Sequence, residues 1–122
     1  MTEQKSRGGL DFEALRRAIE ERDAEALAGL YADDAELRII NRYATPSYAS
    51  LLVGKTAISS YLDDVCGRAM SHHIEREVVG EGRAAFNEAC EYPDGTRVLC
   101  AATLEIEDAK IIRQLNVEVW DE

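Results

Sequence analysis

The chain has 122 residues, which is enough for one domain with one hydrophobic core and too few for two. Hydrophobic residues make up 46% and charged residues 31%, proportions that indicate a globular protein rather than a disordered or fibrous one. The 24 acidic and 14 basic side chains give a net charge of -10, which repels nucleic-acid phosphates and anionic membrane surfaces. We therefore expect neither a nucleic-acid nor a membrane partner.

The cysteines and apolar segments bear on the cellular compartment. Cys66, Cys90 and Cys100 show no metal-binding spacing such as C-x-x-C, and their odd number favours reduced thiols over a disulfide framework. The apolar run at residues 51–53 is too short to span a bilayer, and the polar first residues lack the apolar region of a signal peptide. We predict a cytoplasmic protein with no metal and no cofactor.

The first part of the chain predicts a tail and two helices. Residues 1–9 carry no periodic pattern and are expected to form a flexible tail before a single domain at residues 10–122. An aspartate cap and apolar residues at helical spacing predict a helix over residues 11–21. A second helix, capped by Asp23, is expected to reach Tyr31.

The pattern then changes from helix to strand and back. Apolar and polar side chains alternate over residues 35–43, which predicts a strand. A short apolar stretch follows at residues 48–53. Gly54 precedes a third helix, in which the apolar residues between 58 and 65 share one face, and Gly67 is expected to end it.

The remainder of the chain predicts four strands joined by tight turns, at residues 72–79, 84–92, 97–106 and 110–120. The clearest turn signal is Pro-Asp-Gly at residues 93–95. If this glycine adopts the left-handed conformation, Cys90 pairs with Val98 and Glu88 with Cys100. The prediction is an α+β domain, with three N-terminal helices packed on a curved, mostly antiparallel sheet in a cone-like α+β barrel. A pocket is expected between sheet and helices.

Three segments resemble the nuclear transport factor 2-like superfamily, and within it the SnoaL-like domain of polyketide cyclases and ketosteroid isomerases. They are Leu-Tyr-Ala-Asp-Asp-Ala at residues 30–35, Gly-Lys-Thr-Ala-Ile at residues 54–58, and Tyr-Pro-Asp-Gly at residues 92–95 followed by two long strands. The resemblance spans nearly the whole chain and implies the same fold. It implies no single activity, because this scaffold hosts isomerases, cyclases, dehydratases, epoxide hydrolases and non-catalytic binders.

The resemblance also indicates two activities of the superfamily whose catalytic residues are absent from this sequence. The ketosteroid isomerase roles, a tyrosine, a protonated aspartic acid and an aspartate base, fall on or next to Leu15, Ala102 and Ile39, none of which can transfer a proton. An epoxide hydrolase of this fold would need an Asp-Arg-Asp set around a water, and no strand places Arg and Asp at alternate inward positions. The looser cyclase-like group remains.

Glu88 is the clearest candidate for chemistry. It lies between Phe86 and Cys90 in a stretch that otherwise reads as a core strand, so its carboxylate would be desolvated and suited to acid–base chemistry near neutral pH. His72 shares the inward-facing set and would suit a partner role. The alternatives are that Glu88 joins His72 or Arg76 in a structural buried network, or that it faces water.

The last strand has two different faces. Following the resemblance, the even-numbered residues from 114 to 120 look into the cavity, and Leu115, Val117 and Val119 form an outer apolar stripe through which a homodimer would form. The opposite parity would bury this stripe in an ordinary core. The expected ligand-binding residues are Tyr31, Asn41, Tyr43, Tyr48, Tyr61, Arg76, Phe86, Gln114, Asn116, Glu118 and Trp120.

The leading hypothesis is a bacterial-type, cofactor-independent acid–base enzyme of cyclase, isomerase or dehydratase type, acting on a small hydrophobic molecule. Glu88 would transfer the proton with His72 as partner, and Asn116 with Tyr43 or Tyr48 would orient the substrate. The alternative is a non-catalytic ligand-binding or dimerisation module. Acidic groups in the pocket would favour a neutral or cationic ligand over an anionic one.

Overall fold

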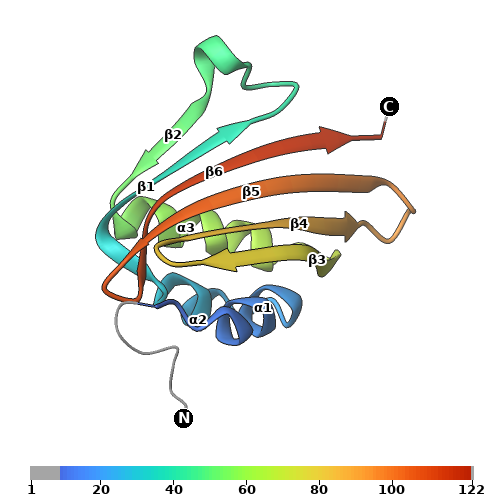
Figure 1. Cartoon of the computed structure of the whole chain (residues 1–122). Coiled ribbons are helices and arrows are strands. Elements are labelled where there is room, and N and C mark those ends of the chain that lie inside the picture. Colours follow the sequence, from blue (N-terminus) through green and yellow to red (C-terminus); the bar gives the residue numbers. More distant parts are fainter. Residues whose placement is uncertain (1–8, 122) are drawn as a thin grey trace.

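The structure, a computed structural model, describes residues 9–121 (Figure 1). Within this part of the chain the helices are α1 (Phe12–Glu20), α2 (Ala24–Ala28) and α3 (Lys55–Cys66), with a short 3-10 turn, η1 (Pro46–Tyr48). The strands are β1 (Tyr31–Ile40), β2 (Ser50–Val53), β3 (Ser71–Gly80), β4 (Arg83–Glu91), β5 (Arg97–Glu107) and β6 (Lys110–Trp120). The tail predicted at residues 1–9 lies, except for its last residue, outside the described part.

All six strands form one sheet in the order β2-β1-β6-β5-β4-β3. Every neighbouring pair is antiparallel except β1 and β6, which run parallel. Figure 1 shows the sheet curving, with α3 behind it and α1 and α2 beside β3. α3 packs on β1 and β2, and α1 packs on β3. The predicted class, helices on a curved and mostly antiparallel sheet, is confirmed.

The first helix begins as predicted, whereas the second ends early. The Asp11 carboxylate accepts a hydrogen bond from the backbone N–H of Ala14, at 3.2 Å, and so caps α1. α2 ends at Ala28, and β1 already begins at Tyr31. The prediction of a helix as far as Tyr31 was wrong, because α2 ends at its C-cap Gly29 and Tyr31 pairs with Ile111 of β6, a long-range contact that overrides the local apolar spacing.

The turn at residues 93–95 sets the predicted pairing. Gly95 has φ of 92°, in the left-handed region that favours glycine. Cys90 pairs with Val98 and Glu88 with Cys100, so the register expected from the sequence is confirmed. The inward face of β4 and β5 is therefore the one that carries Glu88.

Arg76 does not point inward as predicted. It has φ of 57° and lies within a register irregularity of the β3–β4 ladder between Glu75 and Val78. The irregularity breaks the period-2 alternation from which the inward position was inferred. As a result Arg76 is exposed.

The hydrophobic core lies between the helices and the inner face of the sheet. Its largest fully buried side chains are Leu15, Leu37, Ile58, Ile74 and Ile111. A separate small cluster of Met70, Cys90 and Val98, with Tyr92 and Trp120 packed against it, covers another part of the inner face. In the described residues no helix is long and apolar enough to cross a membrane.

Candidate functional site

A cavity of about 390 Å³ lies between the inner face of the sheet and the helices. Its floor consists of inward-facing residues of β1, β4, β5 and β6, and α1 and α3 contribute Leu15, Ile19, Tyr61 and Leu62 to its wall. The volume is within the range of small-molecule sites, which are mostly apolar with a few placed polar groups. The cavity can therefore hold a small organic molecule.

The structure brings most of the predicted site residues to this cavity. Tyr48 and Arg76 are not among its lining residues; Tyr48 lies in η1 with 84% of its surface exposed. Tyr43 belongs to the lining although it is 82% exposed, which places it at the rim. The remaining predicted residues all line the cavity: His72, Glu88, Tyr31, Asn41, Tyr61, Phe86, Gln114, Asn116, Glu118 and Trp120.

The parity of β6 is the one expected from the resemblance. Its even-numbered residues from 114 to 120 line the cavity, and Val117 and Val119 are exposed on the opposite face of the sheet. β6 lies in the sheet between β1 and β5, and from residue 113 to residue 120 its successive side chains point to opposite faces. The alternative in which Leu115, Val117 and Val119 form the core is wrong.

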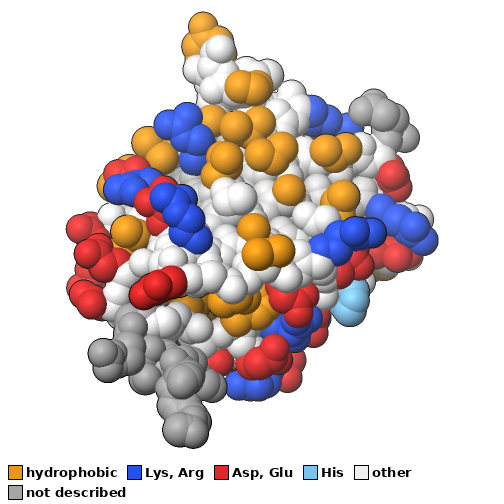
Figure 2. Space-filling view, in the orientation of Figure 1, with side chains coloured by type: hydrophobic (Ala, Val, Ile, Leu, Met, Phe, Trp, Pro, Cys, Tyr) orange, Lys and Arg blue, Asp and Glu red, His pale blue; other side chains and the backbone are white. Residues whose placement is uncertain are grey.

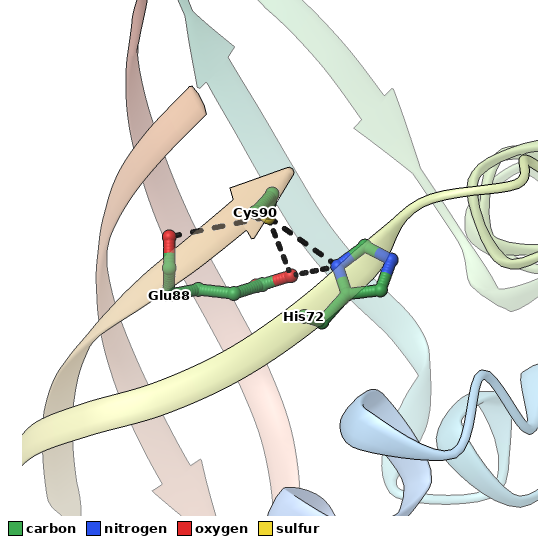
Figure 3. A group of neighbouring side chains, drawn as sticks. All are labelled: His72, Glu88 and Cys90. Carbon is green, nitrogen blue, oxygen red and sulfur yellow. Dashed lines mark hydrogen bonds and ion pairs between the residues drawn. The ribbon is translucent and has the colours of Figure 1, made fainter. Parts of the chain in front are cut away.

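Three side chains from β3 and β4 meet at the cavity wall. His72 pairs with Cys90 in the antiparallel ladder, and Glu88 lies two residues away on the same face of β4. The His72 Nδ1 atom is 2.7 Å from Glu88 Oε2 and 3.3 Å from Cys90 Sγ, and Sγ is 3.4 Å from the same Oε2 (Figure 3). The predicted partnership of Glu88 and His72 is thus a direct contact.

Cys90 was expected only as a core residue, and its place in this group was missed. The turn signal at residues 93–95 predicts the pairing of β4 with β5, but no comparable signal predicts the register between β3 and β4. That register decides that Cys90, rather than a neighbour, lies beside His72.

Burial separates the roles of the two titratable groups. The His72 side chain is 4% exposed, whereas the Glu88 side chain is 18% exposed and lines the cavity. The second ring nitrogen of His72, Nε2, is buried and has no hydrogen-bond partner among residues 9–121. A ligand in the cavity can therefore contact Glu88, whereas the buried His72 contacts and orients the Glu88 carboxylate.

A chain of hydrogen bonds runs along the part of the cavity floor that β1 and β6 form. The Tyr31 hydroxyl donates to the Gln114 side-chain carbonyl at 2.6 Å, and the Gln114 amide donates to the Asn116 carbonyl at 2.8 Å. Both acceptor oxygens are engaged, and the Asn116 side-chain NH₂ has no acceptor within the described part of the chain. The chain therefore ends in a free donor at the cavity.

Burial keeps the hydroxyl and thiol groups of the cavity protonated. It raises the pKa of Tyr31 and Tyr61 above the ordinary value of 10.0, and the charge of Glu88 or Glu118 raises each further. Burial and Glu88 likewise raise the pKa of the Cys90 thiol. At neutral pH these groups are hydrogen-bond donors, and Cys90 is not a thiolate nucleophile.

Aromatic and charged side chains surround another part of the lining. The Asn41 amide donates to Glu118 at 3.0 Å, and the rings of Tyr92 and Trp120 lie 6.0 Å apart. Arg68 donates to the Tyr92 hydroxyl at 3.2 Å and to Asp64 at 2.6 Å. The positive charge of Arg68 is thus paired, while Glu88 and Glu118 add negative charge.

A curved, mostly antiparallel sheet covered by helices on one face, with a mixed polar and apolar cavity between the two layers, is a fold of the NTF2-like type. The family model of the SnoaL-like domain matches residues 12–114, so the chain belongs to the SnoaL-like domain family. No curated protein matches the sequence.

Solved structures share this fold at low sequence identity. An NTF2-like protein of unknown function from Mesorhizobium loti has a TM-score of 0.76 and 17% identity, over 97% of this chain and 96% of its own. A proposed ketosteroid isomerase from Kribbella flavida has a TM-score of 0.70 and 18% identity, over 91% and 75%. A proposed polyketide cyclase from Sinorhizobium meliloti has a TM-score of 0.67 and 18% identity, over 86% of this chain and 91% of its own. These similarities establish the fold only.

Proposed function

We propose that the chain is a cofactor-independent acid–base enzyme acting on a small hydrophobic molecule. Glu88 transfers the proton, and His72 orients the carboxylate. The observation that carries this proposal is the 2.7 Å contact between His72 Nδ1 and Glu88 Oε2 in the wall of a largely apolar cavity. Carboxylates in such surroundings are suited to abstracting or donating protons.

The position of Asn116 supplies the second half of the chemistry. Asn116 pairs with Ala102 on β5, and Ala102 pairs with Phe86 on β4, so the free amide lies two strands from the strand of Glu88. Glu88 and Asn116 both line the cavity. A substrate lying there would lose a proton to Glu88 while the Asn116 NH₂ stabilises the negative charge that develops on an oxygen.

The charges of the cavity favour a neutral or cationic substrate. Glu88 and Glu118 both line it, and the one arginine of the lining, Arg68, is already paired with Asp64. The rings of Tyr31, Tyr61 and Phe86 offer flat apolar surface to a ring-containing molecule.

A second function, ligand binding without catalysis, is favoured by a different observation. Leu15 and Ile39 line the cavity and Ala102 is buried, so the positions that carry the isomerase proton-transfer groups are filled with aliphatic side chains. In that function the His72–Glu88 pair would be a buried structural network.

Deuterium exchange distinguishes the two functions without knowledge of the natural reaction. Cyclic ketones are incubated in D₂O with the protein, exchange at the carbon next to the carbonyl is followed by proton NMR, and binding is measured by saturation transfer. Glu88→Gln keeps the shape of the side chain and should slow protein-dependent exchange by about 100-fold or more while binding persists. Glu91→Gln, at an exposed position of the same strand, is the matched control.

Equal exchange by wild type and Glu88→Gln would contradict the role of Glu88. Binding of these ketones to the wild type without any exchange would favour the non-catalytic function.

We also propose that the chain forms a homodimer through the outer face of the sheet. The outer apolar patch consists of Ile40, Leu51, Leu99, Leu115, Val117 and Val119. Leu99 pairs with Val119 and Val117 with Ile40, whereas Arg38 lies between Leu51 and Leu115 on the same face. Val119 is 66% exposed, and Figure 2 shows hydrophobic side chains gathered across this side of the molecule. A second copy would remove this surface from water.

A further inference from the structure

We propose that His72, Glu88 and Cys90 form a binding site for one zinc ion in the cavity wall. The inference goes beyond the proposed function. A bound ion would occupy the Glu88 carboxylate and so prevent it from transferring a proton. It rests on the convergence of three different ligand types on one point, from two adjacent strands (Figure 3).

The separations between the donor atoms are close to those of a zinc site. The three atoms lie within 4.8 Å of one another. Tetrahedral zinc with ordinary bond lengths requires about 3.5 Å between sulfur and a nitrogen or oxygen ligand, and about 3.3 Å between nitrogen and oxygen. The two distances from Cys90 Sγ are 3.3 Å and 3.4 Å. Only the 2.7 Å contact between His72 and Glu88 must open, by a change in the Glu88 side chain.

Binding is balanced in protons and charge. In the ion-free protein Cys90 is a thiol, and on binding its proton is released to solvent. If the His72 ring proton is on Nδ1, it moves to Nε2. Within the described residues Nε2 has no hydrogen-bond partner, so no hydrogen bond is lost by this move. The thiolate and the carboxylate then neutralise the two positive charges of the ion, so no net charge is buried.

The ligand set selects the kind of ion. A thiolate, an imidazole and a carboxylate suit Zn²⁺ and Co²⁺, whereas Mg²⁺ and Ca²⁺ require oxygen ligands. All three residues line the cavity, so the remaining coordination position is available to water or to a cavity ligand. This arrangement is that of an open zinc site rather than a closed structural one.

Cobalt titration of the full, metal-free chain under reducing conditions tests the site. We expect about one equivalent of Co²⁺ to bind, with the intense visible bands of tetrahedral cobalt and a thiolate-to-cobalt absorption in the near ultraviolet, both removed by Zn²⁺. Cys90→Ser should abolish the thiolate absorption, and Cys90→Ser and His72→Gln should each weaken Zn²⁺ binding on the order of 100-fold.

Two matched variants serve as controls. Cys100→Ser alters a buried thiol on the adjacent strand, and His73→Gln alters the neighbouring imidazole on the opposite face of β3. Both should bind Zn²⁺ as the wild type does. The inference is overturned if the wild type shows no thiolate-to-cobalt absorption, or if Cys90→Ser and His72→Gln bind Zn²⁺ as tightly as these controls.

Additional measurements keep the test decisive if a variant does not fold. Circular dichroism checks the fold of each variant, and Co²⁺ added to the wild type should shift and broaden the side-chain NMR signals of His72, Glu88 and Cys90 most strongly, and signals of residues on the outer face of the sheet much less. Broadening confined to other residues would refute the site. These readouts record binding and not turnover, so failure of the zinc site and failure of the proposed acid–base function remain distinguishable.

Discussion

At the scale of single residues, the pair of Glu88 and His72 depends on a two-residue offset between facing strands. His72 is opposite Cys90, and Glu88 is the next residue on the same face of β4, within reach of the imidazole. A buried carboxylate without such a partner would lose much of its hydration without compensation. The stability of the site therefore depends on the imidazole as much as on the carboxylate.

Replacing His72 by alanine should destabilise the protein by about 2–3 kcal/mol, because Glu88 loses its partner and a small cavity is left. Urea unfolding followed by circular dichroism measures the change. His73→Ala removes the same side chain from an exposed position and should cost less than about 0.5 kcal/mol. Equal effects of the two substitutions would mean that the pair adds nothing to stability.

Tyr61 predicts how stability depends on alkaline pH. Burial raises its pKa in the folded state above the ordinary 10.0, so its contribution to stability is fully present below pH 10 and is lost as the pH rises further, when the unfolded chain ionises first. Tyr61→Phe should flatten this loss by up to about 1.4 kcal/mol per pH unit, measured by urea unfolding between pH 8 and 11. Tyr48→Phe, at an exposed position, should leave the slope unchanged; identical slopes for all three proteins would refute the burial argument.

At the scale of elements, regular strands were predictable and irregular ones were not. β4 and β5 pair without a break from Glu91 and Arg97 to Arg83 and Glu105, and the turn at residues 93–95 sets this pairing. The ladder of β5 with β6 is regular from Val98 and Trp120 to Glu105 and Arg113, and has an irregularity beyond that point. β1 and β3 each contain a register irregularity, and there the prediction was wrong in the start of β1 and in the direction of Arg76. A bulge interrupts the alternation of apolar and polar residues, and in the sequence this interruption looks the same as the end of a strand.

The turn glycine offers a test at this scale. Gly95 has φ of 92° with no atom within 4 Å of an added Cβ, so Gly95→Ala should cost about 1 kcal/mol through backbone strain alone. Gly29→Ala is the control, since Gly29 has helical φ and ψ and an added Cβ would make only ordinary contacts. Thermal unfolding of both variants measures the difference; an unaffected Gly95→Ala protein would show that this turn carries no strain.

At the scale of the whole molecule, the two faces of the sheet have different roles. The inner face carries the core and the cavity, and the outer face carries the outer apolar patch. The same alternation along β6 produces both, because its successive side chains point to opposite faces. The site and the proposed dimer interface thus share one strand.

Val117→Lys should convert the proposed dimer into a monomer, because a charge in the centre of the outer apolar patch would be buried without a partner. Light scattering on the purified chain measures the molecular mass. Val78→Lys introduces the same charge on an exposed valine of β3 outside this patch and should leave the dimer intact. A wild type that is monomeric, or a Val117→Lys variant that remains dimeric, would contradict the proposed interface.

The sequence by itself determined the class of fold, the order of elements, the pairing of β4 with β5 and the inward position of Glu88. These follow from local signals, namely periodicity, caps and one turn. Only the tertiary structure decided that Cys90 lies beside His72 and Glu88, that Asn116 ends a hydrogen-bond chain with a free donor, and that Arg76 turns outward. These depend on strand registers, bulges and side-chain packing, which arise from contacts between residues far apart in the chain.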